Sequence, residues 1–178
     1  MSIYLRNIIR FVLLILIQVL LLNRIPLNWW APPYIAFVYP LFILLLPIST
    51  PTTFLMVFAF FTGLTMDAFM NTGGIHAMAC VTIAFSRRKV LAFFLPQRLS
   101  EYQNATPGPK IMSWGSFLAY AAILMLIHNL VYTLVEIWAL QSFWYYLAKT
   151  GITFLTSMAF VVIYLLLFTK SVNIKAFD

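Results

Sequence analysis

The chain has 178 residues, of which 63% are hydrophobic and only 8% are charged, and its formal net charge is +7. A soluble domain is about half apolar and about a quarter charged, so this composition cannot cover a soluble domain with polar side chains. It excludes a soluble protein, and the single cysteine excludes an internal disulfide bond. The sequence therefore predicts one all-α integral membrane domain over residues 1–178, with lipid as its solvent.

Apolar segments in the N-terminal half predict the first three transmembrane helices. The first covers residues 8–22, and since no small-x-small cleavage site follows it, we interpret it as a span and not as a signal peptide. The second, residues 34–46, contains Pro40, which should kink a helix because proline lacks the backbone N–H. The third covers residues 52–70 and ends at the turn sequence Asn71-Thr72-Gly73-Gly74.

The fourth apolar run, residues 75–85, has only about half of the ~20 residues that a membrane crossing needs. The basic triplet Arg87-Arg88-Lys89 follows it. We expect this triplet to anchor the chain at the membrane surface, with binding of anionic lipid headgroups as the alternative. The helix either continues through the triplet into the interface or turns back as a re-entrant hairpin. The second case leaves five spans in place of six.

The C-terminal half predicts a polar loop and two more spans. The loop covers residues 96–113, the fifth span residues 114–140 and the sixth residues 151–168. With six spans and the N-terminus inside, nine of the eleven basic residues lie on the inner side. These are Arg6, Arg10, Arg87, Arg88, Lys89, Arg98, Lys110, Lys170 and Lys175, while Arg24 and Lys149 lie outside. The positive-inside rule selects this N-in, C-in bundle, and it accounts for most of the positive charge without nucleic acid.

Polar side chains inside the predicted spans are candidates for a functional site, because charged groups are costly in lipid. Helical spacing places Asp67 and Asn71 on one face of the third span, with His76 just beyond the turn. Three further residues recur every four positions on the fifth span: His128, Tyr132 and Glu136. They predict an outward-facing pocket for a small ligand or a partner. Two alternatives stay open: the groups neutralise one another and hold the bundle together, or Glu136 lies at the wet interface without a role.

Small residues on the third span predict a close helix contact. Ala59, Gly63 and Asp67 follow one another at four-residue intervals and form a seam on one helix face. Seams of this kind let helix backbones approach each other closely. We expect this seam to pack against a neighbouring helix or against the single transmembrane helix of a partner.

Enzyme chemistry has little support in the sequence. An aspartyl peptidase needs two facing aspartates, and only Asp67 lies within a predicted span. Neither a GxSxG nucleophile motif nor a phosphate-binding glycine-rich loop is present. A zinc ion would need Asp67 as third ligand beside His76 and His128. We therefore predict a protein that is not an enzyme and holds no metal or cofactor.

The segment 32–88 resembles the rod-shape-determining protein MreD family of bacteria. The shared features are Pro33-Tyr34, Tyr39-Pro40-Leu41-Phe42, Leu46-Pro47, Gly63-Leu64-Thr65-Met66-Asp67-Ala68-Phe69, Gly73-Gly74-Ile75-His76-Ala77-Met78-Ala79 and Arg87. By motif the resemblance covers about a third of the chain. The remainder is similar only in length and in the number of spans.

This resemblance implies a multi-pass subunit of the bacterial inner membrane that serves the cell-elongation machinery, peptidoglycan synthesis and cell shape. Its expected partner is MreC, and through MreC the actin-like MreB and the RodA/penicillin-binding-protein synthase. The family is also similar to the substrate-binding S components of energy-coupling-factor transporters. An S-component-like binder of a small molecule or lipid is therefore the alternative function. The resemblance implies no catalytic residue.

Overall fold

The computed structural model describes residues 3–24, 35–95, 105–137 and 142–168, and all regular structure in these ranges is helical. The helices are α1 (Ile3–Leu16), α2 (Leu41–Leu44), α3 (Thr52–Met70), α4 (Ile75–Phe94), α5 (Pro109–Met112), α6 (Trp114–Glu136) and α7 (Phe143–Phe168). A π-helical turn, Ile17–Leu21, and a 3₁₀ turn, Leu22–Arg24, extend α1. Four helical segments are long and apolar enough to cross a membrane: Leu5–Arg24, α3, α6 and α7. The predicted all-α class is thus confirmed, and the length and composition of these four segments fit the predicted membrane domain.

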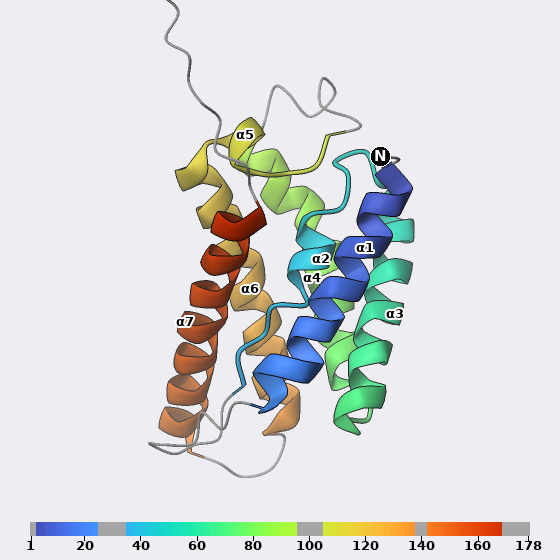
Figure 1. Cartoon of the computed structure of the whole chain (residues 1–178). Coiled ribbons are helices and arrows are strands. Elements are labelled where there is room, and N and C mark those ends of the chain that lie inside the picture. Colours follow the sequence, from blue (N-terminus) through green and yellow to red (C-terminus); the bar gives the residue numbers. More distant parts are fainter. Residues whose placement is uncertain (1–2, 25–34, 96–104, 138–141, 169–178) are drawn as a thin grey trace, which may run out of the picture.

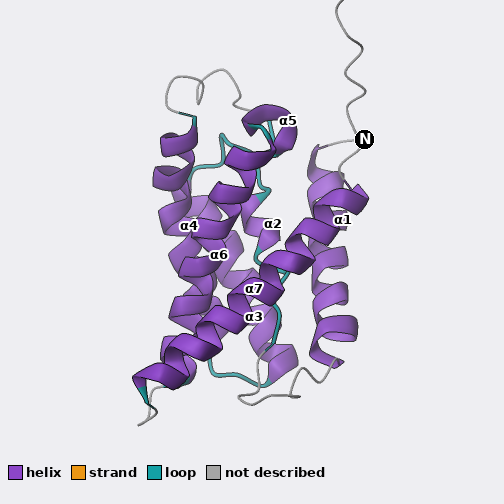
Figure 2. Ribbon diagram, turned by 90° about the vertical axis from the view of Figure 1, so that its left-hand side faces the viewer, coloured by secondary structure: helices purple, strands orange, loops and turns teal. Residues whose placement is uncertain are grey.

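The long helices form a bundle in which successive elements run in opposite directions (Figure 1). Helix α3 descends and α4 returns beside it, and α4 in turn packs along α6. Helix α7 ascends against α6 and ends at the end of the bundle where α1 begins (Figure 1). Residues 35–48, which we call the internal segment, run between these helices and include α2 (Figures 1 and 2).

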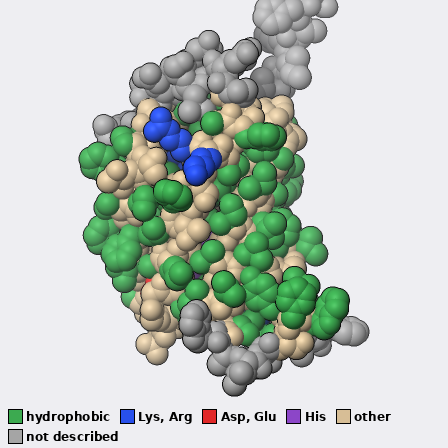
Figure 3. Space-filling model, turned by 180° about the vertical axis from the view of Figure 1, so that it is seen from behind, with side chains coloured by type: hydrophobic (Ala, Val, Ile, Leu, Met, Phe, Trp, Pro, Cys, Tyr) green, Lys and Arg blue, Asp and Glu red, His purple; other side chains and the backbone are tan. Residues whose placement is uncertain are grey.

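The bundle is apolar on its outside as well as in its core. Phe93 is 77% exposed and Leu155 is 67% exposed, and Figure 3 shows apolar side chains over most of one face. A soluble protein rarely presents such a surface, whereas hydrocarbon accepts it. In the core, every residue of the internal segment from 36 to 46 is buried, and Tyr39 and Leu41 are fully buried. The outside therefore meets lipid, and the internal segment forms the centre of the bundle.

The second predicted span needs correction. Residues 34–46 were expected to form a kinked transmembrane helix, but only the four residues of α2 are helical within the described residues 35–46. Pro40 precedes this turn and supplies no N–H, and residues 35–38 have no regular structure. The hydrogen bonds that a helix would provide come here from the side chains of neighbouring helices. Six helical spans are therefore not observed.

The fourth predicted span is longer than expected. Helix α4 is continuous over 20 residues and passes through the basic triplet, so it is not a re-entrant hairpin. It is not among the four segments that are apolar enough to cross a membrane, because it contains three adjacent basic residues. The sixth span also begins earlier than predicted, because α7 starts at Phe143 and thus includes Lys149. The polar loop 96–113 contains the short helix α5, and its residues 96–104 lie outside the described part.

Candidate functional site

The internal segment is held by side chains that replace helical hydrogen bonds. Gln18, which lies in the π-helical turn after α1, donates to the carbonyl of Ala36 (2.9 Å) and accepts from the N–H of Val38 (2.8 Å). From α7, Ser157 accepts a hydrogen bond from the N–H of Phe37 (2.8 Å). Irregular backbone at membrane depth is stable only where protein groups bind its polar atoms. Gln18 and Ser157, both fully buried, meet this requirement.

Arg87 binds the other end of the internal segment. Its Nη2 donates to the carbonyls of Leu44 (3.5 Å) and Leu46, and its Nε donates to the hydroxyl of Tyr120 (3.0 Å). Tyr120 itself donates to the Leu44 carbonyl (3.1 Å). The last carbonyls of a helix have no partner within the helix, and here Arg87 binds that of Leu44, the last residue of α2, and that of Leu46 just beyond it. A guanidinium group is suited to them because it carries five N–H donors.

The predicted membrane-surface anchor is therefore only partly correct. Arg87 is 2% exposed and lies inside the bundle, because the α2 carbonyls attract its side chain. Arg88 and Lys89 are exposed, and Lys89 lies over the ring of Phe85 at 5.5 Å. Figure 3 shows basic side chains near the upper end of an otherwise apolar face.

A chain of hydrogen bonds connects α4, the internal segment and α6 through two histidines. The hydroxyl of Tyr39 lies 2.8 Å from Nδ1 of His76 and 2.8 Å from Nε2 of His128. Nδ1 of His128 lies 3.3 Å from the side-chain oxygen of Asn129. A hydroxyl group and a neutral imidazole ring can each donate and accept, so these three contacts form one continuous chain. Nε2 of His76 is buried without a partner among the described residues.

Asp67 caps the N-terminus of α4 from the preceding helix. Its carboxylate accepts hydrogen bonds from the N–H groups of His76 (3.1 Å) and Ala77 (3.0 Å) and from the hydroxyl of Thr72 (2.6 Å). The residue at the N-cap position is Gly74, which has φ 91° and no side chain to cap the helix. A carboxylate at this position satisfies free donors and interacts favourably with the helix dipole. Asp67 thus ties α3 to α4.

Close packing strengthens the same helix pair. A Cβ atom added at Gly63 would lie 2.3 Å from the Cα of Ala77, so only glycine permits this approach. The predicted seam of Ala59, Gly63 and Asp67 is buried in the bundle, and Gly63 and Asp67 contact the start of α4 directly. A partner helix therefore has no access to the seam itself.

Glu136 connects α6 to α7. Its carboxylate lies 2.7 Å from Nζ of Lys149 and accepts a hydrogen bond from Tyr132 (3.4 Å). The Lys149 side chain is 8% exposed, although the sequence placed it in the outer loop. The ring of Tyr132 packs on Phe37 of the internal segment, with ring centroids 4.6 Å apart.

The predicted polar pocket is thus divided among separate contacts. His76 and His128 do meet, through Tyr39, but Asp67 binds the α4 terminus and Glu136 binds Lys149. Asn71 is exposed, and with φ 54° it ends α3 in the left-handed conformation. Among the described residues, no group of three His, Cys, Asp or Glu side chains could hold a metal ion.

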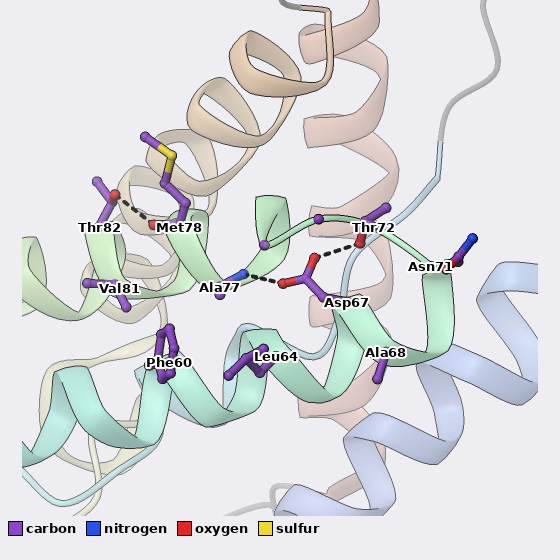
Figure 4. Close-up of a pocket in the computed structure, with 12 residues that line it drawn as sticks. Phe60, Leu64, Asp67, Ala68, Asn71, Thr72, Ala77, Met78, Val81 and Thr82 are labelled. Atoms are coloured by element: carbon purple, nitrogen blue, oxygen red, sulfur yellow. Dashed lines mark hydrogen bonds between the residues drawn. The ribbon is translucent and has the colours of Figure 1, made fainter.

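A groove of about 860 Å³ lies between α3 and α4 (Figure 4). Its walls are mainly apolar, and its polar end is formed by Asp67, Asn71 and Thr72. The other side chains labelled in Figure 4 are Phe60, Leu64, Ala68, Ala77, Met78, Val81 and Thr82. Ala68 is the smallest side chain that α3 contributes to the groove. The groove is open to the outside, since Leu64 is 40% and Met78 54% exposed.

Sequence reasoning missed several residues that hold the internal segment. Gln18 is the only polar residue in the apolar run 11–22, and this isolation was a usable signal. Tyr39 and Ser157 gave no such signal, because hydroxyl side chains are common in membrane helices and often bind their own backbone.

Comparisons with protein-family models, with curated proteins and with solved structures found no match to this chain. The likeness to the MreD family therefore rests on the motif residues.

Proposed function

We propose that this protein is a non-enzymatic inner-membrane subunit of the bacterial cell-elongation machinery, of the MreD kind, that binds MreC. Through MreC it would support peptidoglycan synthesis and cell shape, with MreB and the RodA/penicillin-binding-protein synthase as indirect partners. In this proposal both termini face the cytoplasm, as the distribution of basic residues predicts.

One observation carries the proposal: the motif residues that resemble the MreD family are those that join the internal segment, α3 and α4. Gly63 allows contact with Ala77, Asp67 caps α4, and Tyr39 bonds to His76. Arg87, the last residue of the resemblance, binds the carboxyl end of α2. The shared motif thus has a physical purpose in this chain, which is to build a helical unit around an irregular centre.

The same contacts favour a scaffold function and not the function of an enzyme or a ligand carrier. Both oxygens of Asp67 accept hydrogen bonds from backbone N–H groups, and Glu136 forms an ion pair with Lys149. A general acid or base needs a group that can exchange protons with a substrate. These carboxylates are instead used to join helices.

We propose that MreC contacts the groove between α3 and α4. The seam of Ala59, Gly63 and Asp67 is buried and is therefore not the contact. A single transmembrane helix needs a face with apolar walls and a small residue at which it can approach closely, and Ala68, one turn beyond Leu64 on α3, provides one. The groove also retains the exposed polar end at Asn71, where the juxtamembrane part of a partner could bind.

The test is affinity purification of the tagged full chain from gently solubilised membranes, followed by mass spectrometry. We expect MreC in the wild-type sample, and a loss in Ala68→Trp of roughly 5- to 150-fold, since overpacking costs about 1–3 kcal/mol. Ala92→Trp is the matched control, because Ala92 is exposed on α4 eleven residues beyond Val81. This variant should retain MreC.

Other outcomes would contradict the proposal. Recovery of a transporter's coupling subunit and ATPases without MreC would favour the S-component-like function. Equal loss of MreC in both tryptophan variants would exclude the groove as the contact, while leaving MreC as the partner.

A further inference from the structure

A second hollow, of about 870 Å³, lies at the end of the bundle where α1 begins. Its walls come from α1, α7, the internal segment and residues 105–111. Three cationic side chains line it, namely Arg6 and Arg10 from α1 and Lys110 from α5. No carboxylate is among the described residues that line it. We call it the basic pocket.

Within the part of the chain that the structure describes, no carboxylate contacts Arg6 or Arg10. Arg6 donates from Nη2 to the hydroxyl of Thr106 (3.5 Å), and Arg10 donates from Nη1 to the carbonyl of Leu45 (2.9 Å). Arg10 also donates to the side-chain oxygen of Asn7 (3.5 Å). These partners are neutral, and each described bond uses one terminal nitrogen of a group with five N–H donors. Arg6 and Arg10 also lie one helical turn apart, where like charges destabilise a helix. An anion would remove this repulsion and accept the free donors.

The shape of the pocket indicates what kind of anion fits. Apolar side chains line the pocket as well, with Leu165 and Phe168 from α7, and Tyr164 lies beside Arg10. A pocket that combines cations with apolar walls matches a phosphate attached to an acyl chain. Guanidinium groups bind phosphate with two parallel hydrogen bonds. Basic pockets between helices on the cytoplasmic side of membrane proteins bind anionic headgroups.

We propose that the basic pocket binds the phosphate of an anionic phospholipid from the leaflet on the side of the N-terminus. This site is distinct from the exposed pair Arg88 and Lys89, which lies on α4 and does not line the pocket. The proposal does not depend on the role in cell elongation, because it rests on the charges and walls of the pocket alone.

The test measures lipid binding to the purified full chain in mild detergent by native mass spectrometry. The ligands are short-chain phosphatidylglycerol and short-chain phosphatidylcholine. We expect phosphatidylglycerol to bind one per chain and phosphatidylcholine to bind about tenfold more weakly, since the choline cation neutralises the phosphate. The double variant Arg6→Gln/Lys110→Gln should weaken phosphatidylglycerol binding by about 25-fold, or about fivefold for each charge.

The matched control is Arg88→Gln/Lys89→Gln, which removes the same charge from exposed positions outside the pocket. Binding should stay within about twofold of wild type in this control. Arg6 and Lys110 are both exposed, so both double variants should keep the wild-type melting temperature.

Equal weakening in the two double variants, or equal binding of the two lipids, would overturn the proposal. Competition with excess inorganic phosphate identifies the source of the anion. Displacement of phosphatidylglycerol by phosphate supports a phosphate site that a soluble anion can also fill. Retention of the lipid supports a site that requires the acyl chain.

Discussion

The α3–α4 hairpin and the internal segment represent two ways of placing polar groups at membrane depth. The hairpin is local: Asp67 caps a helix that begins eight residues later, and Gly63 contacts Ala77. The internal segment depends on distant residues, since Gln18 and Ser157 belong to the first and last long helices. One region follows from short-range sequence signals, whereas the other exists only once the whole bundle has assembled. Substitutions in each region can measure how much the local and the distant contacts contribute to stability.

The largest effect is expected where the distant contacts converge, at Arg87. Arg87→Met keeps the length of the side chain but removes the donor to the Leu46 carbonyl and to the Tyr120 oxygen, while the Leu44 carbonyl keeps its hydrogen bond from Tyr120. A buried oxygen left without its donor costs about 1–3 kcal/mol, so the loss at both oxygens should lower the free energy of unfolding by roughly 2–6 kcal/mol. The measurement is an SDS unfolding titration of the purified protein.

The control is Arg88→Met, which removes the neighbouring but exposed guanidinium. Its unfolding free energy should stay within about 0.5 kcal/mol of wild type. If Arg88→Met costs as much as Arg87→Met, the contact of Arg87 with α2 is not the cause.

A smaller effect is expected in the hairpin. Gly63→Ala adds a Cβ atom 2.3 Å from the Cα of Ala77, and α3 and α4 must separate to accept it. Overpacking of this kind costs about 1–3 kcal/mol, which the same titration would detect. The matched variant is Gly151→Ala in α7, where an added Cβ meets no atom within 4 Å. It should be neutral or stabilising by up to about 1 kcal/mol, as helix propensity predicts. A loss in both variants would refute the close approach.

The smallest effect is expected at the cap of α4. Asp67→Asn retains one acceptor oxygen but loses the charge at the helix N-terminus and one of the two backbone contacts. A cap of this kind contributes about 0.5–2 kcal/mol. Hydrogen exchange should rise at the N–H groups of His76 and Ala77 and stay unchanged in α7. Unchanged exchange at both amides would contradict the capping role.

These differences explain which features the sequence could predict. The turn at residues 71–74, the ends of α3 and the membrane class follow from local composition, and each is as predicted. The close packing of Gly63 also carries a local signal in its four-residue spacing. The helix at 34–46 was predicted because its residues are apolar, and the only local warning was Pro40.

The site could be predicted only as a set of residues and not as a set of contacts. Helical spacing placed His128 and Glu136 on one face of the fifth span, but their partners lie on other elements. Tyr39 comes between the two histidines from a segment that sequence treated as an ordinary span. Arg87 seemed a surface residue because charge usually indicates exposure, whereas the carbonyls that bind it appear only in the folded bundle.

We propose that the α3–α4 groove receives the transmembrane helix of MreC, as part of a bacterial elongation scaffold. The most direct measurement is photo-crosslinking in living cells, with benzoylphenylalanine in place of Ala68 in the groove or of Ala92 outside it. We expect a cross-link from position 68 to the transmembrane helix of MreC and none from position 92. A cross-link to MreC from position 92 alone, or to a transporter coupling subunit from position 68, would contradict the proposed binding of MreC in the groove.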